Sequence, residues 1–70
     1  MYKNQASEIA YDYIVDQIRS GIWKPGDKIA TEVQLVESIG VSRVAVREAI
    51  ERLVTMSVLN KVRGSGTYVE

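Results

Sequence analysis

Apolar side chains recur every three or four residues over residues 6–20, which is the spacing of one face of an amphipathic helix. The apolar set comprises Ala6, Ile9, Ala10, Tyr13, Ile14 and Ile18. Gly21 follows this stretch, and glycine commonly ends a helix. Pro25 and Gly26 then stand at the second and third positions of a type II turn. The pattern therefore predicts a helix followed by a tight reversal of the chain.

Two further helices are predicted, separated by a very short connection. Thr31 and Gln34 have the spacing of a capping box, so a short helix begins there and runs to about Ile39. Ser42 can cap the next helix through its hydroxyl group. The apolar positions of that helix again keep helical spacing, and they are Val46, Ala49, Ile50 and Leu53. Because only residues 40–42 join the two helices, the arrangement indicates a helix-turn-helix motif.

The pattern changes from helical to extended near the C-terminus. Residues 58–62 and 67–69 are rich in β-branched and aromatic side chains, and they flank the tetrapeptide Arg63-Gly64-Ser65-Gly66. These runs predict a β-hairpin with a basic tip. The expected fold is mainly α with a small β-hairpin, a winged helix-turn-helix of three helices plus a wing, and residues 1–70 are expected to form a single domain.

The composition excludes several kinds of chemistry. The 70 residues include neither Cys nor His, so the chain has no disulfide, no Cys/His zinc site, no thiol nucleophile and no Ser-His pair. A chain of this size has room for one small domain without a deep pocket. Asp12 and Asp16 lie one helical turn apart, but no other group is predicted to converge on them, so they are expected on a solvated face. We expect no enzymatic activity, no metal and no cofactor.

No part of the sequence predicts contact with a membrane. Charged or polar residues interrupt every apolar run long before the ~20 residues that a transmembrane helix needs. Residues 1–5 lack the apolar core of a signal peptide. A cytoplasmic protein is therefore expected.

Basic residues are concentrated in the second part of the chain, although the net charge is zero. Residues 1–40 carry four basic and six acidic side chains, whereas residues 41–70 carry five and three. Arg43 and Arg47 are four residues apart, on a helix face that points away from the apolar stripe. The planar guanidinium group matches a phosphate or the O6/N7 edge of guanine. This pair predicts that the third helix, about residues 43–55, enters the major groove of DNA.

Ion pairing within the helix is the structural alternative for the arginines. Arg47 and Glu51 are four residues apart, as are Arg52 and Glu48, and such solvated pairs stabilise a helix by a few tenths of a kcal/mol. Arg52 points away from the face of Arg43 and Arg47. An ion pair with Glu48 is therefore its expected role.

Two hydroxyl side chains and the wing tip complete the candidate site. Thr31 and Ser42 are each expected to cap a helix, and helix N-termini also attract phosphate. The wing tip combines Arg63 with two glycines, so it can approach the DNA backbone or enter a narrow minor groove. Gly64 and Ser65 are included with Arg63 among the expected contacts. A plain hairpin turn is the alternative explanation of this tip.

Several motifs follow one another along the chain at fixed spacing. They are Pro25-Gly26-Asp27-Lys28-Ile29, Thr31-Glu32, Gly40-Val41-Ser42-Arg43, Val46-Arg47-Glu48-Ala49-Ile50, Leu53 and Arg63-Gly64-Ser65-Gly66-Thr67-Tyr68-Val69. Together they resemble the DNA-binding domain of the GntR family of bacterial transcription regulators. The resemblance covers residues 9–69. The run Val-Arg-Glu-Ala-Ile is most similar to the subfamily of the fatty-acid regulator FadR.

The resemblance implies a homodimeric regulator that binds a palindromic operator in double-stranded DNA and responds to a small-molecule effector in a larger C-terminal domain. The groove and phosphate contacts that it implies are Ser42, Arg43, Val44, Ala45 and Arg47, with Arg63 and Gly64 of the wing in the minor groove. Val44 and Ala45 would offer apolar contacts, for example to a thymine methyl group. The sequence stops at Glu70, where the resemblance places the start of the effector domain, so the chain is either an excised domain or a natural stand-alone one. Because members of the family are nearly always longer, excision is the expectation.

The chain departs from the family pattern at several positions. Ala30 stands where the family often has Pro. Val33 stands where relatives often carry an Arg that contacts DNA, so that contact is missing or replaced. Ser57 occupies a place that Gly usually holds, and a different turn is expected there.

A function of another class stays open at this point. A winged helix can also serve as a protein-interaction module without specific DNA binding, which the zero net charge favours. Its partner would then bind the apolar surface near Trp23 or Tyr68. Binding to DNA at low salt distinguishes the two functions.

Overall fold

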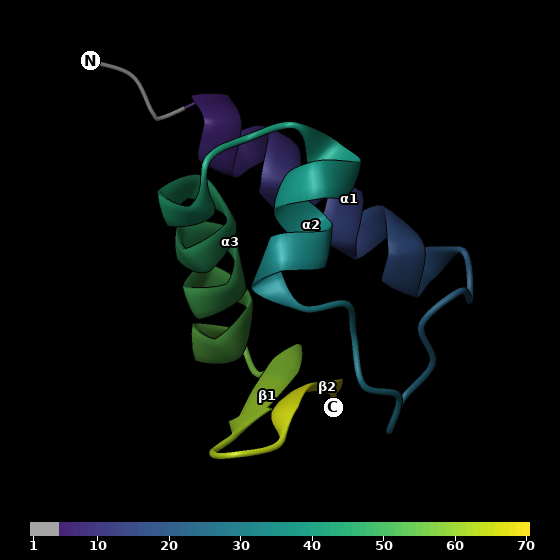
Figure 1. Ribbon diagram of the computed structural model, residues 1–70. Coiled ribbons are helices and arrows are strands. Elements are labelled where there is room, and N and C mark those ends of the chain that lie inside the picture. Colours follow the sequence, from purple (N-terminus) through teal and green to yellow (C-terminus); the bar gives the residue numbers. More distant parts are fainter. Residues whose placement is uncertain (1–4) are drawn as a thin grey trace.

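Three helices and a terminal hairpin follow one another in the computed structural model, which describes residues 5–70 (Figure 1). The elements are α1 (Gln5–Arg19), α2 (Glu32–Ile39), α3 (Arg43–Thr55), β1 (Leu59–Val62) and β2 (Gly66–Val69). In Figure 1, α1 begins above the start of α3 and passes behind α2, and the hairpin lies below the C-terminal end of α3. The predicted winged helix-turn-helix fold is confirmed. The expected lack of a signal peptide rests on residues 1–5, of which residues 1–4 lie outside the described part of the chain.

Local hydrogen bonds fix the ends of the helix-turn-helix as the sequence predicts. Thr31 Oγ1 accepts from the N–H of Gln34 at 3.1 Å, and Gln34 Oε1 accepts from the N–H of Thr31 at 2.9 Å, which completes the capping box. Gly40, with φ 83°, follows the end of α2. Ser42 Oγ accepts from the N–H of Ala45 at 3.1 Å and so caps α3. The short connection between the two helices is therefore set by the residues that flank it.

The predicted turn between α1 and α2 is also present. The N–H of Asp27 donates to the carbonyl of Lys24 at 2.8 Å, and Gly26 has φ 91°, as a type II turn requires at its third position. Asp27 Oδ2 additionally accepts from the N–H of Lys24 at 2.8 Å. The turn directs residues 26–29 back toward the hairpin.

Residues 26–29 form a third extended segment beside the hairpin. β1 and β2 pair antiparallel, with Leu59 opposite Val69. On the other edge of β2, the N–H of Ile29 donates to the carbonyl of Thr67 at 2.9 Å, and the N–H of Gly26 donates to that of Val69 at 2.9 Å. β2 is therefore bonded on both edges, and the segment that leads into α2 is joined to the wing.

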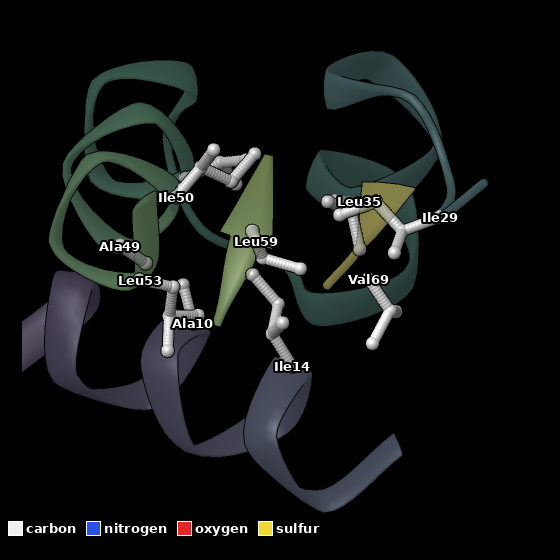
Figure 2. Close-up of a cluster of buried hydrophobic side chains, with 10 residues drawn as sticks. Ala10, Ile14, Ile29, Leu35, Ala49, Ile50, Leu53, Leu59 and Val69 are labelled. Carbon is white, nitrogen blue, oxygen red and sulfur yellow. The ribbon is translucent and has the colours of Figure 1, made fainter. Parts of the chain in front are cut away.

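Side chains from all these elements meet in one apolar core. Figure 2 shows Leu59 of β1 in the middle of the cluster, with Leu53 of α3 and Ile14 of α1 close by. The buried cluster comprises Ala10, Ile14, Ile29, Leu35, Val46, Ala49, Ile50, Leu53, Leu59 and Val69. Because α3 contributes four of these residues, its opposite face is held toward solvent by the packing of the core.

The C-terminal end of α3 is a Schellman motif whose left-handed residue is a serine. The N–H of Ser57 donates to the carbonyl of Val54 at 3.0 Å, and the N–H of Val58 donates to that of Leu53 at 2.9 Å. Ser57 has φ 62°, and Gly21 takes the same role after α1 with φ 84°. The expectation of a different turn at Ser57 is therefore wrong, because the serine adopts the conformation that glycine favours.

We expect Ser57→Gly to stabilise the domain by about 0.5–1 kcal/mol. An L-residue in the left-handed region costs about 1–2 kcal/mol, and the greater freedom of glycine in the unfolded chain offsets part of the gain. Urea denaturation followed by circular dichroism measures the change. Ser57→Ala keeps the strained conformation, so it should give no stabilisation, and an unchanged midpoint for Ser57→Gly would contradict the assignment of strain.

Candidate nucleic-acid interface

The first turns of α3 present a group of exposed side chains. The side chains of Arg43 and Arg47 are 62% and 60% exposed, and Val44 between them is 61% exposed. The N-cap residues Ser42 and Thr31 are exposed as well. The N-terminus of α3 and two guanidinium groups thus lie together on an exposed surface that a polyanion can reach.

Glu32, the first residue of α2, binds both arginines at once. Its Oε1 atom accepts from Arg43 Nε at 3.2 Å, and its Oε2 atom accepts from Arg47 Nε at 3.0 Å. No pattern in the sequence points to Glu32, because it lies 11 positions before Arg43 and 15 before Arg47 on another helix, and such separations have no periodic relation. Its one local signal was a carboxylate directly after the N-cap Thr31.

The charge of Glu32 is maintained by its partners. Partial burial alone would raise the pKa of this carboxyl group, but the hydrogen bonds and positive charges of Arg47 and Arg43 lower it below its ordinary value of 4.5. The carboxylate is therefore ionised at neutral pH. Both arginines are held by an ion pair before any partner arrives.

Ala45 does not belong to the exposed group. Its side chain is 0% exposed, because it lies on the buried face of α3 four residues before Ala49. The expectation that its methyl group contacts a base is wrong. The four-residue spacing from Ala49 and the eight-residue spacing from Leu53 were the signals that could have assigned it to the core.

Arg52 joins α3 to α1. Its Nη1 atom donates to Glu8 Oε2 at 2.9 Å, and its guanidinium carbon lies 4.2 Å from the ring centroid of Tyr11. The sequence placed Arg52 away from Arg43 and Arg47, but in the structure it lines the same open groove as Arg47, and it is bonded to Glu8 of α1. The expected ion pair with Glu48 stays a prediction. The open groove between the start of α1 and α3 is lined by Ser7, Glu8, Val44, Arg47, Glu48, Glu51 and Arg52.

Glu51 links α3 to the wing. It was the sequence-based alternative partner of Arg47, but its Oε2 atom accepts from Lys61 Nζ of β1 at 2.9 Å. Both side chains of this pair are about half exposed. The pair therefore adds little stability, but it connects α3 to the first strand of the wing.

The wing tip carries an unneutralised cation. Arg63 is exposed, and no acidic side chain within residues 5–70 forms an ion pair with it. Ser65 Oγ lies 2.5 Å from the hydroxyl oxygen of Tyr68, and the N–H of Ser65 donates to the carbonyl of Val62 at 2.9 Å. Gly64 and Ser65 are both exposed. The tip is thus held by its own strands while its cation faces solvent.

Three other sequence expectations concern the surface outside this group. Val33 is exposed and lines a shallow groove with Arg43, so an apolar side chain stands where relatives often carry an arginine. Trp23 is half buried and packs against the core. Tyr68 is half buried, and its hydroxyl group is hydrogen-bonded to Ser65 of the wing tip. Within the described residues, no group of three or more metal-binding side chains is present, and no helix is long and apolar enough to span a membrane.

A capped helix-turn-helix followed by a hairpin is a winged-helix architecture, and the sequence identifies its family. The sequence model of the family described as bacterial regulatory proteins, gntR family, matches residues 6–69. The chain belongs to the gntR family. This gntR-family chain is a winged-helix DNA-binding domain of the type found in transcription regulators, as the sequence predicted.

Two relatives of this gntR-family domain are named as repressors. The mannosyl-D-glycerate transport/metabolism system repressor MngR of Escherichia coli (strain K12) is 49% identical over 59 residues, which are 84% of this chain and 25% of MngR. The histidine utilization repressor of Klebsiella aerogenes is 38% identical over 56 residues, which are 80% of this chain and 23% of that repressor. The chain thus spans about a quarter of the length of the curated relatives that it matches.

A solved relative of this gntR-family domain is bound to DNA. The crystal structure of AraR(DBD) in complex with operator ORE1 superposes with a TM-score of 0.88 at 36% identity. The superposition covers 100% of this chain and 83% of that chain. The likeness extends through the helices and the wing.

Proposed function

We propose that this chain reads an operator in double-stranded DNA, with α3 in the major groove and the wing tip, residues 63–66, in the minor groove. The observation that carries the proposal is the exposed pair of Arg43 and Arg47 at the N-terminal end of α3, beside two helix N-caps. The AraR complex supports the proposal, since a domain of the same fold is crystallised on its operator in that structure.

Each exposed residue has a role that suits its chemistry. Arg43 and Arg47 would donate to guanine edges, and Val44 would contact a base through its apolar side chain. The N-termini capped by Thr31 and Ser42 would bind phosphate. The wing residues Arg63, Gly64 and Ser65 would approach the minor groove, where a narrow width concentrates negative potential; Figure 1 shows the wing at the end of α3.

The whole regulator would contain more than this domain. The named relatives are about four times as long as the part that matches, so we propose that residues 1–70 act within a longer protein that carries an effector-binding C-terminal domain. A homodimer of such a protein would bind a palindromic operator, because a two-fold axis in the protein requires one in the site. A zero net charge gives this domain little non-specific affinity, and two linked domains compensate for it.

The proposed function also bears on the localisation, the lack of enzymatic activity and the subfamily of this protein. A transcription regulator has no need of a catalytic site, and its DNA is in the bacterial cytoplasm, so we infer a cytoplasmic protein that is not an enzyme. The FadR-like subfamily rests on the Val46–Ile50 run alone, and the two repressors named above are named for mannosyl-D-glycerate and histidine rather than for fatty acids. A C-terminal domain, once sequenced, decides the subfamily.

Selection from a randomised duplex library tests the proposal. The wild-type domain should enrich one sequence motif, and Arg43→Ala should lose its preference at one base pair of that motif while it retains the others. The same motif from both proteins would show that Arg43 reads no base. Absence of binding even at low salt would favour the protein-interaction module over DNA recognition.

A further inference from the structure

A single carboxylate organises the proposed base-reading arginines. Glu32 is only 28% exposed in its side chain, while both arginines are about 60% exposed, so the carboxylate lies beneath them. Each oxygen of Glu32 accepts from the Nε atom of one arginine, at 3.2 Å for Arg43 and 3.0 Å for Arg47. The three side chains form a cluster, Glu32-Arg43-Arg47, with the acid between two bases.

The atoms that Glu32 engages leave the reading edge of each arginine free. A guanidinium group has five N–H donors, one on Nε and two on each Nη atom. With Nε bonded to the carboxylate, the end formed by Nη1 and Nη2 is available for two parallel hydrogen bonds. That end fits the O6 and N7 atoms of guanine bidentately.

The acid also counteracts two unfavourable effects. Two like charges four residues apart on a helix repel each other, and a carboxylate between them reverses the interaction. Free arginine side chains have many rotamers, and each loses about 0.5–1.5 kcal/mol of conformational freedom when it is fixed on binding. In the cluster this ordering takes place before DNA binds.

We propose that Glu32 is a positioning residue for sequence readout, which holds the guanidinium groups of Arg43 and Arg47 in the orientation that reads bases. This inference rests on the proposed function of the two arginines. Glu32 lowers the charge that α3 presents to phosphate and orients the remaining donors toward base edges. It therefore weakens binding to any DNA and strengthens the difference between the operator and other sequences.

Glu32→Gln tests the inference because it removes the charge and keeps the shape of the side chain. We expect tighter binding to a scrambled duplex, with a steeper salt dependence, because the domain gains one unit of positive charge. The ratio of operator affinity to scrambled-duplex affinity should fall about fivefold or more, since the loss of one well-placed bidentate contact has at least this effect. Glu32→Asp retains the negative charge but has a shorter side chain. The ratio of operator affinity to scrambled-duplex affinity should therefore fall partly, while the affinity for the scrambled duplex should not rise.

Glu37→Gln is the matched control. Glu37 lies on the same helix, is exposed, and forms no ion pair with any described residue. The control should raise the affinity for both duplexes alike and leave their ratio unchanged. A Glu32→Gln protein that is merely unfolded would lose affinity for both duplexes, which differs from the expected gain on scrambled DNA.

The arginine variants distinguish the positioning role of Glu32 from the proposed reading of DNA by Arg43 and Arg47. The role of Glu32 would be overturned if Glu32→Gln kept the wild-type ratio of operator to scrambled-duplex affinity while Arg43→Ala and Arg47→Ala reduced it. The proposed function would then remain intact. Wild-type ratios in the arginine variants as well would overturn the proposed function, and the positioning role with it.

Discussion

Arg47→Ala is expected to weaken binding to the selected operator by about 5- to 150-fold, which corresponds to about 1–3 kcal/mol. Arg47 is exposed on the recognition face of α3, and its Nε is already held by Glu32 at 3.0 Å. On the proposed function, the substitution removes two donors that would bind one base, and it leaves the carboxylate of Glu32 with Arg43 as its partner. Fluorescence anisotropy with the operator duplex measures the loss, and the preference at one base pair should relax as well.

Arg19→Ala is the matched control for this prediction. Arg19 is exposed at the last residue of α1, and Figure 1 shows that end of α1 on the opposite side of the molecule from α3. The change in charge is the same, but binding to the operator should stay within about twofold of wild type. Equal losses for the two variants would mean that the arginines act through net charge alone.

Leu53→Ala is expected to cost about 2–5 kcal/mol of folding free energy. Leu53 is 0% exposed, lies in the cluster that Figure 2 shows, and its carbonyl accepts the bond from Val58 that closes the end of α3. A domain of this size has a total stability of roughly 3–10 kcal/mol, so the variant retains little of it. Thermal and urea denaturation followed by circular dichroism measure the loss.

Ile22→Ala is the control for the core. Ile22 is 62% exposed, so removal of its side chain leaves no cavity and should change the stability by no more than about 0.5 kcal/mol. Leu53→Ala with wild-type stability would show that the core is not packed as described.

Signals within one element were readable from the sequence, and contacts between elements were not. The capping box at Thr31 and the cap at Ser42 depend on atoms three residues apart, and the structure has both. The apolar stripe of α3 repeats with helical period, and Leu53 of that stripe is buried as the spacing requires. These features depend only on local backbone geometry, which the identity of a few neighbouring residues determines.

The missed features arise from tertiary placement. Glu32 meets Arg43 and Arg47 only because α2 and α3 cross at the short connection, and no spacing along the chain encodes that distance. The pairing of residues 26–29 with β2 was also not predicted, since a segment of four residues has no periodicity that distinguishes a strand from a loop. Ala45 shows the opposite error, because a resemblance of motifs was given more weight than its place on the buried face of the helix.

The pairing of residues 26–29 with β2 has a consequence for how the domain meets a duplex. The segment leads directly into α2, so backbone hydrogen bonds connect the helix-turn-helix to the wing without a hinge between them. The conformational entropy lost in ordering the wing is therefore lost when the domain folds and not when it binds DNA. A domain that is already ordered in this way does not adapt its own shape to the site. Any mismatch in groove width or helical phase must then be met by deformation of the DNA, so that the stiffness of the base steps becomes part of what is recognised.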